Sequence, residues 1–211
     1  MCAAAAMLLL PVFAAEDVTA SITVEPHSQD CSQAFLSAIE SIKQARGGTI
    51  VLKPGEYHFA AGTAKEMRFY ISNHDQSPSH PVNLPLVGVT NLTIRGNGAK
   101  LIFHGATLGA AIIDSKNVRL ENLSMDWSRP FLTEMTITGF EDGRTLGRID
   151  GTLFPYEIEN GRLVACGEGW RSPVGGCMLF DGATHHIVEK SADIPYFGAV
   201  IKRADGMLSC E

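Results

Sequence analysis

Two stretches of alternating apolar and polar residues resemble each other between residues 86 and 129. Residues 91–95 (Asn-Leu-Thr-Ile-Arg) align with residues 117–121 (Asn-Val-Arg-Leu-Glu) at an offset of 26, and residues 99–103 align with residues 123–127 at an offset of 24. Such alternation is typical of strands with one buried face. A period of this length with two short strands per repeat is too long for a hairpin and predicts coils of a solenoid.

Stacking the two coils in register predicts which residues lie over one another, because paired strands run about 4.8 Å apart. On the outer face, Arg95 should lie over Glu121 as an ion pair. The change of offset falls at a corner, where residues 96–98 (Gly-Asn-Gly) face Asn122. The expected internal ladder places Leu92 over Val118, Ile94 over Leu120 and Phe103 over Trp127.

A helical pattern precedes these strands at residues 30–46. Phe35, Ala38, Ile39 and Ile42 recur at helical spacing, residues 30 and 33 (Asp and Gln) can form a capping box, and two glycines at 47–48 end the pattern. A β-branched strand at residues 49–57, broken by a Pro-Gly turn, comes next. Parallel β-helices often begin in this way, with a helix covering the open end of the stack. Residues 16–130 are therefore predicted to form the first coils.

The pattern changes after Pro130. Residues 136–138 lead to an Asp-Gly turn at 142–143, residues 156–158 lead to an Asn-Gly turn at 160–161, and a further strand is expected from Cys177 to Phe180. These signals are typical of antiparallel hairpins. We interpret residues 131–183 as an inserted antiparallel β-barrel or sandwich module. For residues 184–211 we consider a return to the β-helix.

The first residues carry an export signal. An apolar run at residues 7–13 is followed by Ala14-Ala15 and then by polar sequence, which predicts a signal peptide over residues 1–15 and a secreted or periplasmic protein. A buried apolar N-terminus is the alternative. The run is far shorter than the roughly 20 residues that span a bilayer, and no later segment is long and apolar enough, so no membrane span is expected.

Charge and cysteine content narrow the classes of partner. The chain has 17 basic and 23 acidic residues, a net charge of −6 and no basic block, which argues against a nucleic-acid partner. Removal of Cys2 with the signal leaves Cys31, Cys166, Cys177 and Cys210, which could pair in three ways or stay as buried thiols. No C-x-x-C pair occurs, and residues 185–186 (His-His) have no carboxylate at ligand spacing. Neither a metal nor another cofactor is expected.

The outer face of a coil could carry carboxylates or contact a glycan. Side chains at i and i+2 of a strand lie roughly 6.5–7 Å apart, and inverting glycosidases use carboxylates about 6.5–9.5 Å apart. Asp126 is the best candidate for glycan binding, since it points outward beside Trp127, which is predicted to be core. An exposed strand-end aspartate would look the same. Asn73, His74 and Asp75 form a polar cluster suited to hydroxyls, or else a solvated loop.

With these residues in view, the chain resembles the N-terminal region of glycoside hydrolase family 110. The words that carry the resemblance are residues 69–76, residues 102–105 (Ile-Phe-His-Gly), residues 115–127, residues 155–158 and residues 167–170 (Gly-Glu-Gly-Trp). The resemblance implies an inverting α-1,3-galactosidase that removes terminal galactose from blood-group-B-type glycans, often as a homodimer. It also implies that the catalytic aspartates belong to coils beyond Glu211, so no catalytic residue is assigned in this chain.

The sequence and the resemblance together predict an all-β chain. The expected architecture is a right-handed parallel β-helix, pectin-lyase-like, with an N-terminal capping helix and an inserted antiparallel β-barrel module. Two alternatives for function remain. A polysaccharide lyase on the same fold needs a basic catalytic residue and commonly an acidic calcium cluster, and no such cluster occurs in the sequence. A non-catalytic carbohydrate-binding β-helix is the other.

Overall fold

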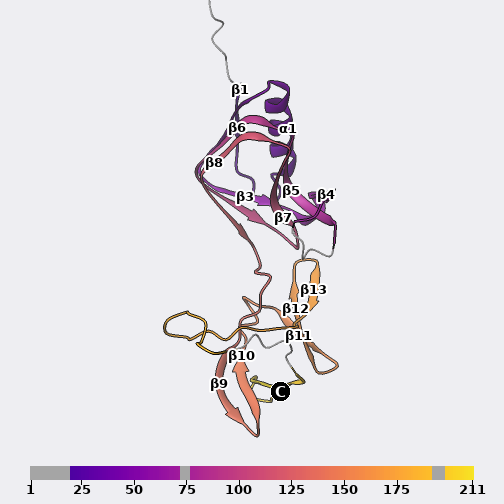
Figure 1. The fold of residues 1–211 in the computed structure, drawn as a ribbon, viewed down its shortest axis with the longest axis vertical. Coiled ribbons are helices and arrows are strands. Elements are labelled where there is room, and N and C mark those ends of the chain that lie inside the picture. The colour runs from indigo at the N-terminus through magenta and orange to yellow at the C-terminus, as the bar shows by residue number, and fades with distance from the viewer. Residues whose placement is uncertain (1–19, 72–76, 192–197) are drawn as a thin grey trace, which may run out of the picture.

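The computed structural model describes residues 20–71, 77–191 and 198–211, and within them the chain forms two lobes (Figure 1). The first lobe contains β1 (Ala20–Val24), α1 (Ser32–Gln44), β2 (Gly48–Leu52), β3 (Glu56–Phe59), the 3-10 turn η1 (Ala61–Thr63), β4 (Lys65–Arg68), β5 (Ser79–Val87), β6 (Thr90–Phe103), β7 (Leu108–Ile113) and β8 (Lys116–Trp127). The second lobe contains β9 (Thr136–Glu141), β10 (Arg144–Arg148), β11 (Tyr156–Glu159), β12 (Arg162–Gly167), β13 (Trp170–Pro173), β14 (Val200–Lys202) and β15 (Leu208–Cys210). The predicted signal peptide lies outside the described residues.

Strands that are far apart in sequence pair in parallel in the first lobe. β1 pairs with β2, β2 and β3 pair with successive parts of β6, and β6 pairs with β8. A second face is formed by β5 and β7, which are also parallel, with β4 antiparallel at its edge. The expected register is confirmed, because Leu92 pairs with Val118 and Phe103 pairs with Trp127.

The corner between the two halves of β6 explains the change of offset. The pairing of β6 with β8 shifts register between Arg95 and Ala99, where β6 has the extra residues. Asn91 and Asn117 stack one above the other at a neighbouring corner, with φ angles of 53° and 52°. The Asn117 side chain donates a 2.7 Å hydrogen bond to Asn91 Oδ1. Outside the coil, the predicted ion pair forms, with 3.1 Å between Arg95 Nε and Glu121 Oε1.

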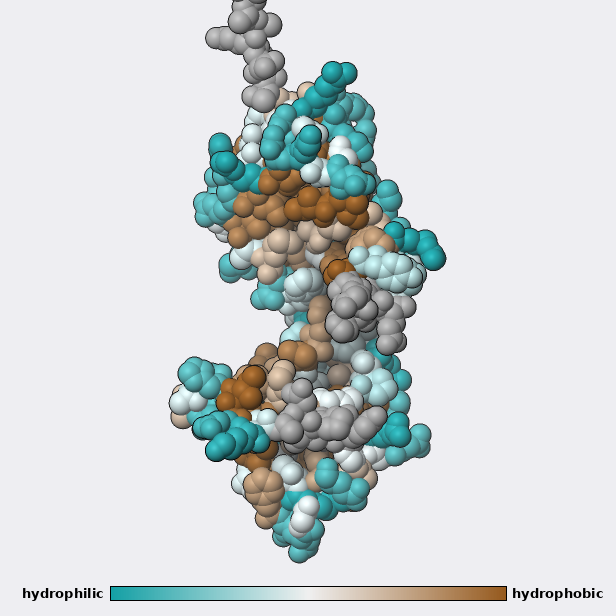
Figure 2. Space-filling model, in the orientation of Figure 1, coloured by the Kyte–Doolittle hydropathy of each residue, from teal (hydrophilic) through white to brown (hydrophobic). Residues whose placement is uncertain are grey.

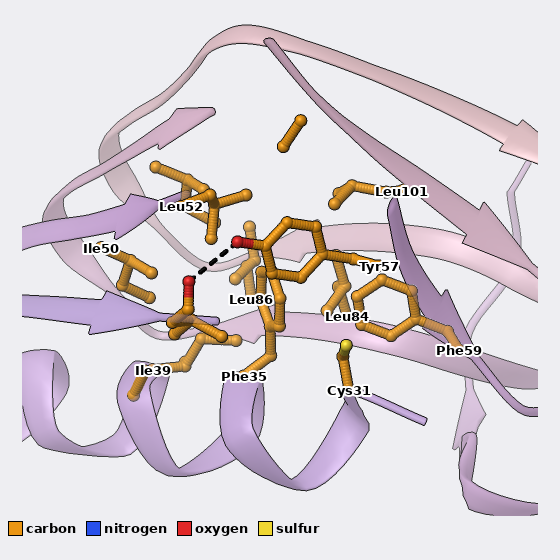
Figure 3. Packing of buried hydrophobic residues seen from close by; sticks show 14 of the residues in the cluster. Cys31, Phe35, Ile39, Ile50, Leu52, Tyr57, Phe59, Leu84, Leu86 and Leu101 are labelled. Carbon is orange, nitrogen blue, oxygen red and sulfur yellow. Dashed lines mark hydrogen bonds between the residues drawn. The ribbon is translucent and has the colours of Figure 1, made fainter. Parts of the chain in front are cut away.

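Apolar side chains from α1 and the parallel strands fill the interior of the first lobe (Figure 3). Tyr57 is fully buried, and its hydroxyl donates to the carbonyl oxygens of Val24 at 2.8 Å and Lys53 at 2.9 Å. Burial of this phenol raises its pKa. The largest fully buried side chains of this core are Tyr57, Phe35, Phe59, Phe103, Ile42, Ile50, Leu52, Leu86, Leu92, Ile94 and Leu101.

The inner ladder is less covered on β8 than on β6. Ile94 is 1% exposed, whereas Leu120, its partner in the register, is 37% exposed. Ile112 on β7 is 52% exposed. Apolar side chains therefore reach the surface of this lobe, which shows a broad hydrophobic area in Figure 2. On β7 and β8, side chains in register with buried residues of β5 and β6 are therefore only partly covered by the described residues.

The helix forms where the apolar spacing predicts it, but the predicted capping box is wrong. Gln33 Nε2 donates to Ser37 Oγ at 3.2 Å instead of turning back to the helix start. Asp30 Oδ1 accepts from the backbone N–H and the hydroxyl of Ser32, at 3.1 and 2.6 Å, and from the backbone N–H of Ala60 at 3.3 Å. Asp30 therefore ties the first turn of α1 to the end of β3.

Replacing Asp30 by asparagine is expected to destabilise the fold in a pH-dependent way. Burial acts to raise the pKa of Asp30, but hydrogen bonds from Ser32 and Ala60 outweigh it and hold the pKa below 3.8. A lowered pKa in the folded state stabilises the fold above the ordinary pKa and is lost as the pH falls through the lowered value. We expect a loss of about 1 kcal/mol at pH 7.

Urea unfolding of wild type and Asp30→Asn between pH 7 and pH 3 measures this difference. The gap between the two free energies of unfolding should narrow below about pH 4. Gln33→Ala removes an exposed side chain of the same turn and should change stability by less than about 0.5 kcal/mol. An equal loss at pH 7 and pH 3 would show that the charge of Asp30 contributes nothing.

The second lobe is antiparallel, as predicted. β9 and β10 form a hairpin around Asp142 and Gly143, whose φ angles of 50° and 73° are those of a tight turn. β11, β12 and β13 form a three-stranded sheet. The expected strand from Cys177 to Phe180 is not found, since Phe180 makes only an isolated bridge to Ile187.

Residues 198–211 do not pair with the parallel strands of the first lobe. β14 and β15 pair antiparallel with each other, and β15 pairs antiparallel with β10. Val200, Leu208 and Cys210 are at most 2% exposed and form a core with Leu163 of β12. Burial of these apolar side chains in the second lobe is the physical reason why the considered return to the β-helix is wrong for this segment.

The described cysteines Cys31, Cys166, Cys177 and Cys210 are free thiols. Burial raises the pKa of Cys31, Cys177 and Cys210. Within the described ranges, no helix has the length and apolar character needed to cross a membrane.

Candidate functional site

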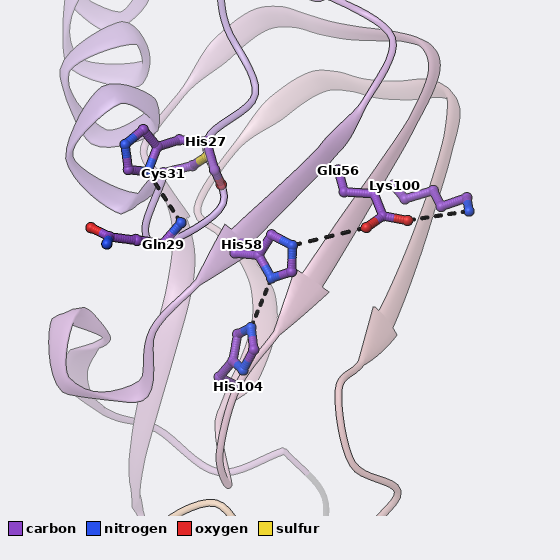
Figure 4. Close-up of polar contacts among 7 residues, drawn as sticks. All are labelled: His27, Gln29, Cys31, Glu56, His58, Lys100 and His104. Carbon is purple, nitrogen blue, oxygen red and sulfur yellow. Dashed lines mark hydrogen bonds and ion pairs between the residues drawn. The ribbon is translucent and has the colours of Figure 1, made fainter.

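A row of polar side chains in contact runs along the outside of the first lobe to the second. Figure 4 shows its part in the first lobe, from Glu56 through His58 to His104. His58 Nδ1 lies 2.9 Å from His104 Nε2, and the two rings stack with their centroids 5.2 Å apart. His104 Nδ1 lies 2.7 Å from Glu168 Oε2. At the other end, His58 Nε2 lies 4.0 Å from Glu56 Oε2. We call Glu56, His58, His104 and Glu168 the polar chain.

The alternation of β3 and β6 positions the polar chain. Tyr57 and Phe59 are fully buried, so Glu56 and His58, which alternate with them along β3, point outward. Phe103 is buried at the end of β6, and the next residue carries the second imidazole. Glu168 comes from the turn between β12 and β13, so two lobes contribute to one set of contacts.

The donor and acceptor capacity of each group determines which atoms donate the hydrogen bonds. A carboxylate only accepts, so the proton in the 2.7 Å contact belongs to His104 Nδ1. In neutral His104 the other nitrogen, Nε2, is then an acceptor, and His58 Nδ1–H donates to it. His58 Nε2 remains without a proton and faces Glu56. In the neutral pair the two hydrogen bonds therefore run in one direction: His58 donates to His104, and His104 donates to Glu168.

The polar chain is partly open to solvent. The side chains of His58 and His104 are 22% and 29% exposed, and those of Glu56 and Glu168 are 56% and 42% exposed. Lys100 Nζ lies 3.4 Å from the second carboxylate oxygen of Glu56. Such groups can exchange protons with water. A hollow of about 470 Å³ lies instead beside β1 and α1.

Asp126 lies on the outer face of β8, as predicted, and is exposed. Ile102 of β6 pairs with both His58 and Asp126, so these three residues form one column across adjacent strands. Asp126 Oδ1 accepts a 2.8 Å hydrogen bond from the backbone N–H of Trp127. The structure therefore brings Asp126 onto the face that carries the polar chain. Its role in glycan binding stays a prediction.

Of the other residues considered from the sequence, three lie outside the described residues and two lie in an exposed turn. Asn73, His74 and Asp75 lie outside the described residues. His185 and His186 occupy an exposed turn in which Asp181 Oδ1 accepts from Ala183 and Thr184. In the ranges that the structure describes, no three His, Cys, Asp or Glu side chains are grouped so as to hold a metal ion.

Aromatic side chains connect the two lobes beside the polar chain. Trp127 faces inward, as predicted, and packs partly buried against the core: its ring centroid lies 5.5 Å from that of Phe103, and its Nε1 donates to the carbonyl of Thr107 at 3.0 Å. Phe131 stands between Trp127 and Trp170, with centroids 5.7 Å from each. A polar and an aromatic contact therefore meet at the junction of the lobes.

Sequence reasoning did not find the polar chain. His104 and Glu168 both lie in words that carry the family resemblance, residues 102–105 and 167–170. The alternation of β3 also indicates that His58 points outward. No pattern in the sequence, however, tells which turn of the second lobe approaches His104, because the two residues are 64 positions apart.

Comparison with known proteins identifies the class first. Residues 133–209, which include β9 to β14 and all but the last residue of β15, match a family described as GLAA-B beta-barrel domain I. The second lobe is therefore similar to a β-barrel domain, which fits its antiparallel sheets.

Curated relatives match both lobes. The chain is 38% identical over 172 residues to Alpha-1,3-galactosidase B of Akkermansia muciniphila, which covers 82% of this chain and 22% of the relative. It is 36% identical over 173 residues to Alpha-1,3-galactosidase B of Parabacteroides distasonis, covering 79% of this chain and 28% of the relative. The protein of that name from Bacteroides thetaiotaomicron is 34% identical over 172 residues, covering 81% and 28%. The chain belongs to the α-1,3-galactosidase family, whose named members are glycoside hydrolases, and spans about a quarter of their length.

Proposed function

We propose that this chain is the N-terminal part of a secreted or periplasmic exo-α-1,3-galactosidase. The substrate would be a glycan of the blood-group-B type, from which terminal α-1,3-linked galactose is hydrolysed with inversion. The observation that carries the proposal is the similarity to named α-1,3-galactosidases along about four fifths of the chain. A polysaccharide lyase is not favoured, because the relatives reported above carry galactosidase names. A homodimer is part of the proposal, as the family resemblance implies.

We further propose that the parallel strands are the first coils of a right-handed parallel β-helix. Stacking in register at offsets of 26 and 24 supports this, as does the packing of α1 against the parallel strands. The partly exposed inner side chains of β8 and β7, Leu120 and Ile112, provide an apolar face on which a further coil could stack.

The catalytic carboxylates are proposed to lie in such further coils, and this chain would act as scaffold. Asp126 and the cluster Asn73, His74 and Asp75 are proposed to contact the glycan. Hydroxyl groups of sugars suit carboxylate and amide partners of this kind. The exposure of Asp126 at the end of β8 is compatible with that role.

A chimera tests whether this chain acts as a scaffold for catalytic carboxylates that lie elsewhere in the enzyme. The chain replaces its homologous region in the Akkermansia relative, and galactose release from an α-1,3-linked trisaccharide is followed by NMR, which also reports the anomer. The chimera should release β-galactose, and the 211-residue chain alone should release none. Asp126→Asn in the chimera should lower kcat/KM by about tenfold.

The control variant is Asp114→Asn, which alters an exposed carboxylate in the turn before β8. It should leave kcat/KM within twofold of the chimera (roughly 0.4 kcal/mol). A folded chimera without activity would contradict the scaffold role. Release of galactose by the chain alone would show that its own residues carry out the hydrolysis.

A further inference from the structure

The polar chain is a side-chain bridge between the two lobes. Glu56 and His58 belong to β3 and His104 follows β6, whereas Glu168 lies in the second lobe. The lobes are also close in their backbones at this point, because a Cβ at Gly105 would lie 3.0 Å from the carbonyl oxygen of Glu168. The contact between His104 and Glu168 is therefore set into a tight junction, where loss of a hydrogen bond affects the neighbouring backbone.

The two imidazoles can hold one added proton without losing their mutual hydrogen bond. In the neutral pair, His58 Nδ1–H donates to His104 Nε2. A proton added to His58 Nε2 points toward Glu56 Oε2, 4.0 Å away, and leaves both hydrogen bonds in place. The positive charge of the pair then lies between the carboxylates of Glu56 and Glu168, and it attracts both.

A second proton cannot be accommodated in the same geometry. It would occupy His104 Nε2 and place an N–H group against the N–H group of His58 Nδ1 across 2.9 Å. Two positive rings would also lie with their centroids 5.2 Å apart. The rings must separate, and since His104 also holds Glu168, its displacement strains the contact between the lobes.

We propose that the pair formed by His58 and His104 is a pH-sensitive contact between the lobes. The contact is kept when the pair carries no added proton or one, and it breaks when both imidazoles are charged. Histidine is suited to this role because its charge changes within the range of pH 5–8. Three charged groups contact the pair or its partner directly: Glu56 lies against His58, Lys100 pairs with Glu56, and Glu168 lies against His104. Asp126 of β8 shares the column of paired residues with His58, and the loop before α1, with His27 and Asp30, bonds to the backbone of residues 58 and 60.

Nitrogen NMR of the imidazole rings tests the hydrogen-bond direction in the 211-residue chain. At pH 8 both His58 and His104 should be protonated on Nδ1, with Nε2 free of a proton, as the contacts to His104 and Glu168 require. A spectrum at pH 8 in which His104 carries its proton on Nε2 would overturn the proposal. This readout depends on the tautomer and is not changed by a merely structural role.

Hydrogen exchange tests whether the contact between the lobes breaks at low pH. Protection factors, which remove the intrinsic pH dependence of exchange, are measured for amides of residues 103–107 and 166–170 at pH 7 and pH 4.5. In the wild type they should fall by about tenfold at the lower pH. His104→Gln should show little change between the two values, because its amide can still donate to Glu168 and accept from His58 without titrating. His104→Ala should be weakly protected at both.

His186→Gln is the matched control, since it removes an exposed imidazole of the second lobe outside the polar chain. It should follow the wild type at both pH values. If His104→Gln loses protection at pH 4.5 as strongly as the wild type, another group opens the junction and the proposal is wrong. Unchanged protection in the wild type would equally overturn it. Neither result bears on galactose release, so the proposed function is tested separately.

Discussion

Phe103→Ala is expected to reduce the free energy of unfolding by about 3–5 kcal/mol. Phe103 is fully buried, and its ring lies between that of Phe59, on which it stacks with centroids 5.1 Å apart, and that of Trp127, which is tilted against it at 5.5 Å. Gly109 lies against the same ring, since a Cβ there would approach it to 2.7 Å. Truncation therefore removes the middle one of three neighbouring aromatic rings. It leaves a cavity, because the paired strands on either side hold the backbone in place.

Urea unfolding followed by tryptophan fluorescence measures the loss. Ile112→Ala is a suitable control, because Ile112 is also an apolar residue of a parallel strand but is 52% exposed. Its replacement should cost less than about 1 kcal/mol. A loss for Phe103→Ala as small as that of the control would contradict the packing described for the first lobe.

Gly96→Ala is expected to have the next largest effect, about 1–3 kcal/mol. A Cβ at position 96 would lie 2.3 Å from the carbonyl oxygen of Asn122 and 2.4 Å from the Cβ of Leu123. Both contacts are to the paired strand β8, at the corner where the register shifts. The backbone of β6 or β8 must move to admit the methyl group, and the parallel pairing on either side of the corner is weakened.

Gly139→Ala in the second lobe is the control for Gly96→Ala. A Cβ at Gly139 meets no atom within 4 Å, so its effect should stay within about 0.5 kcal/mol. Thermal unfolding of both variants beside the wild type gives the comparison. Equal melting temperatures for the wild type and Gly96→Ala would mean that the two coils do not approach as closely as described.

The sequence predicted the parallel register because the information is local to each coil. Arg95 and Glu121 could be placed together from one offset, and the alternation of apolar residues fixed which face was inside. The hairpins of the second lobe were predictable for a similar reason, since Asp142-Gly143 and Asn160-Gly161 are strong turn signals. Local patterns of two to five residues were sufficient for these elements.

The failures concern contacts that no local pattern specifies. Val200 and Leu208 lie in three-residue strands, too short for an alternation signal, and their place in the second lobe depends on packing against distant residues. The capping box failed because Gln33 had another partner one turn away. For the candidate site, the outward direction of Asp126 was predictable, whereas the link between His104 and Glu168 arises only when two lobes meet.

The free state of the described cysteines has a consequence for how this protein can be prepared. Cys31 and Cys210 are buried as thiols in separate lobes, so neither core depends on a covalent cross-link. Folding of these lobes therefore needs no oxidant, and expression in a reducing cytoplasm should yield the same structure. Partly exposed Cys166 and Cys177 are the thiols that a reducing agent must protect during purification and storage.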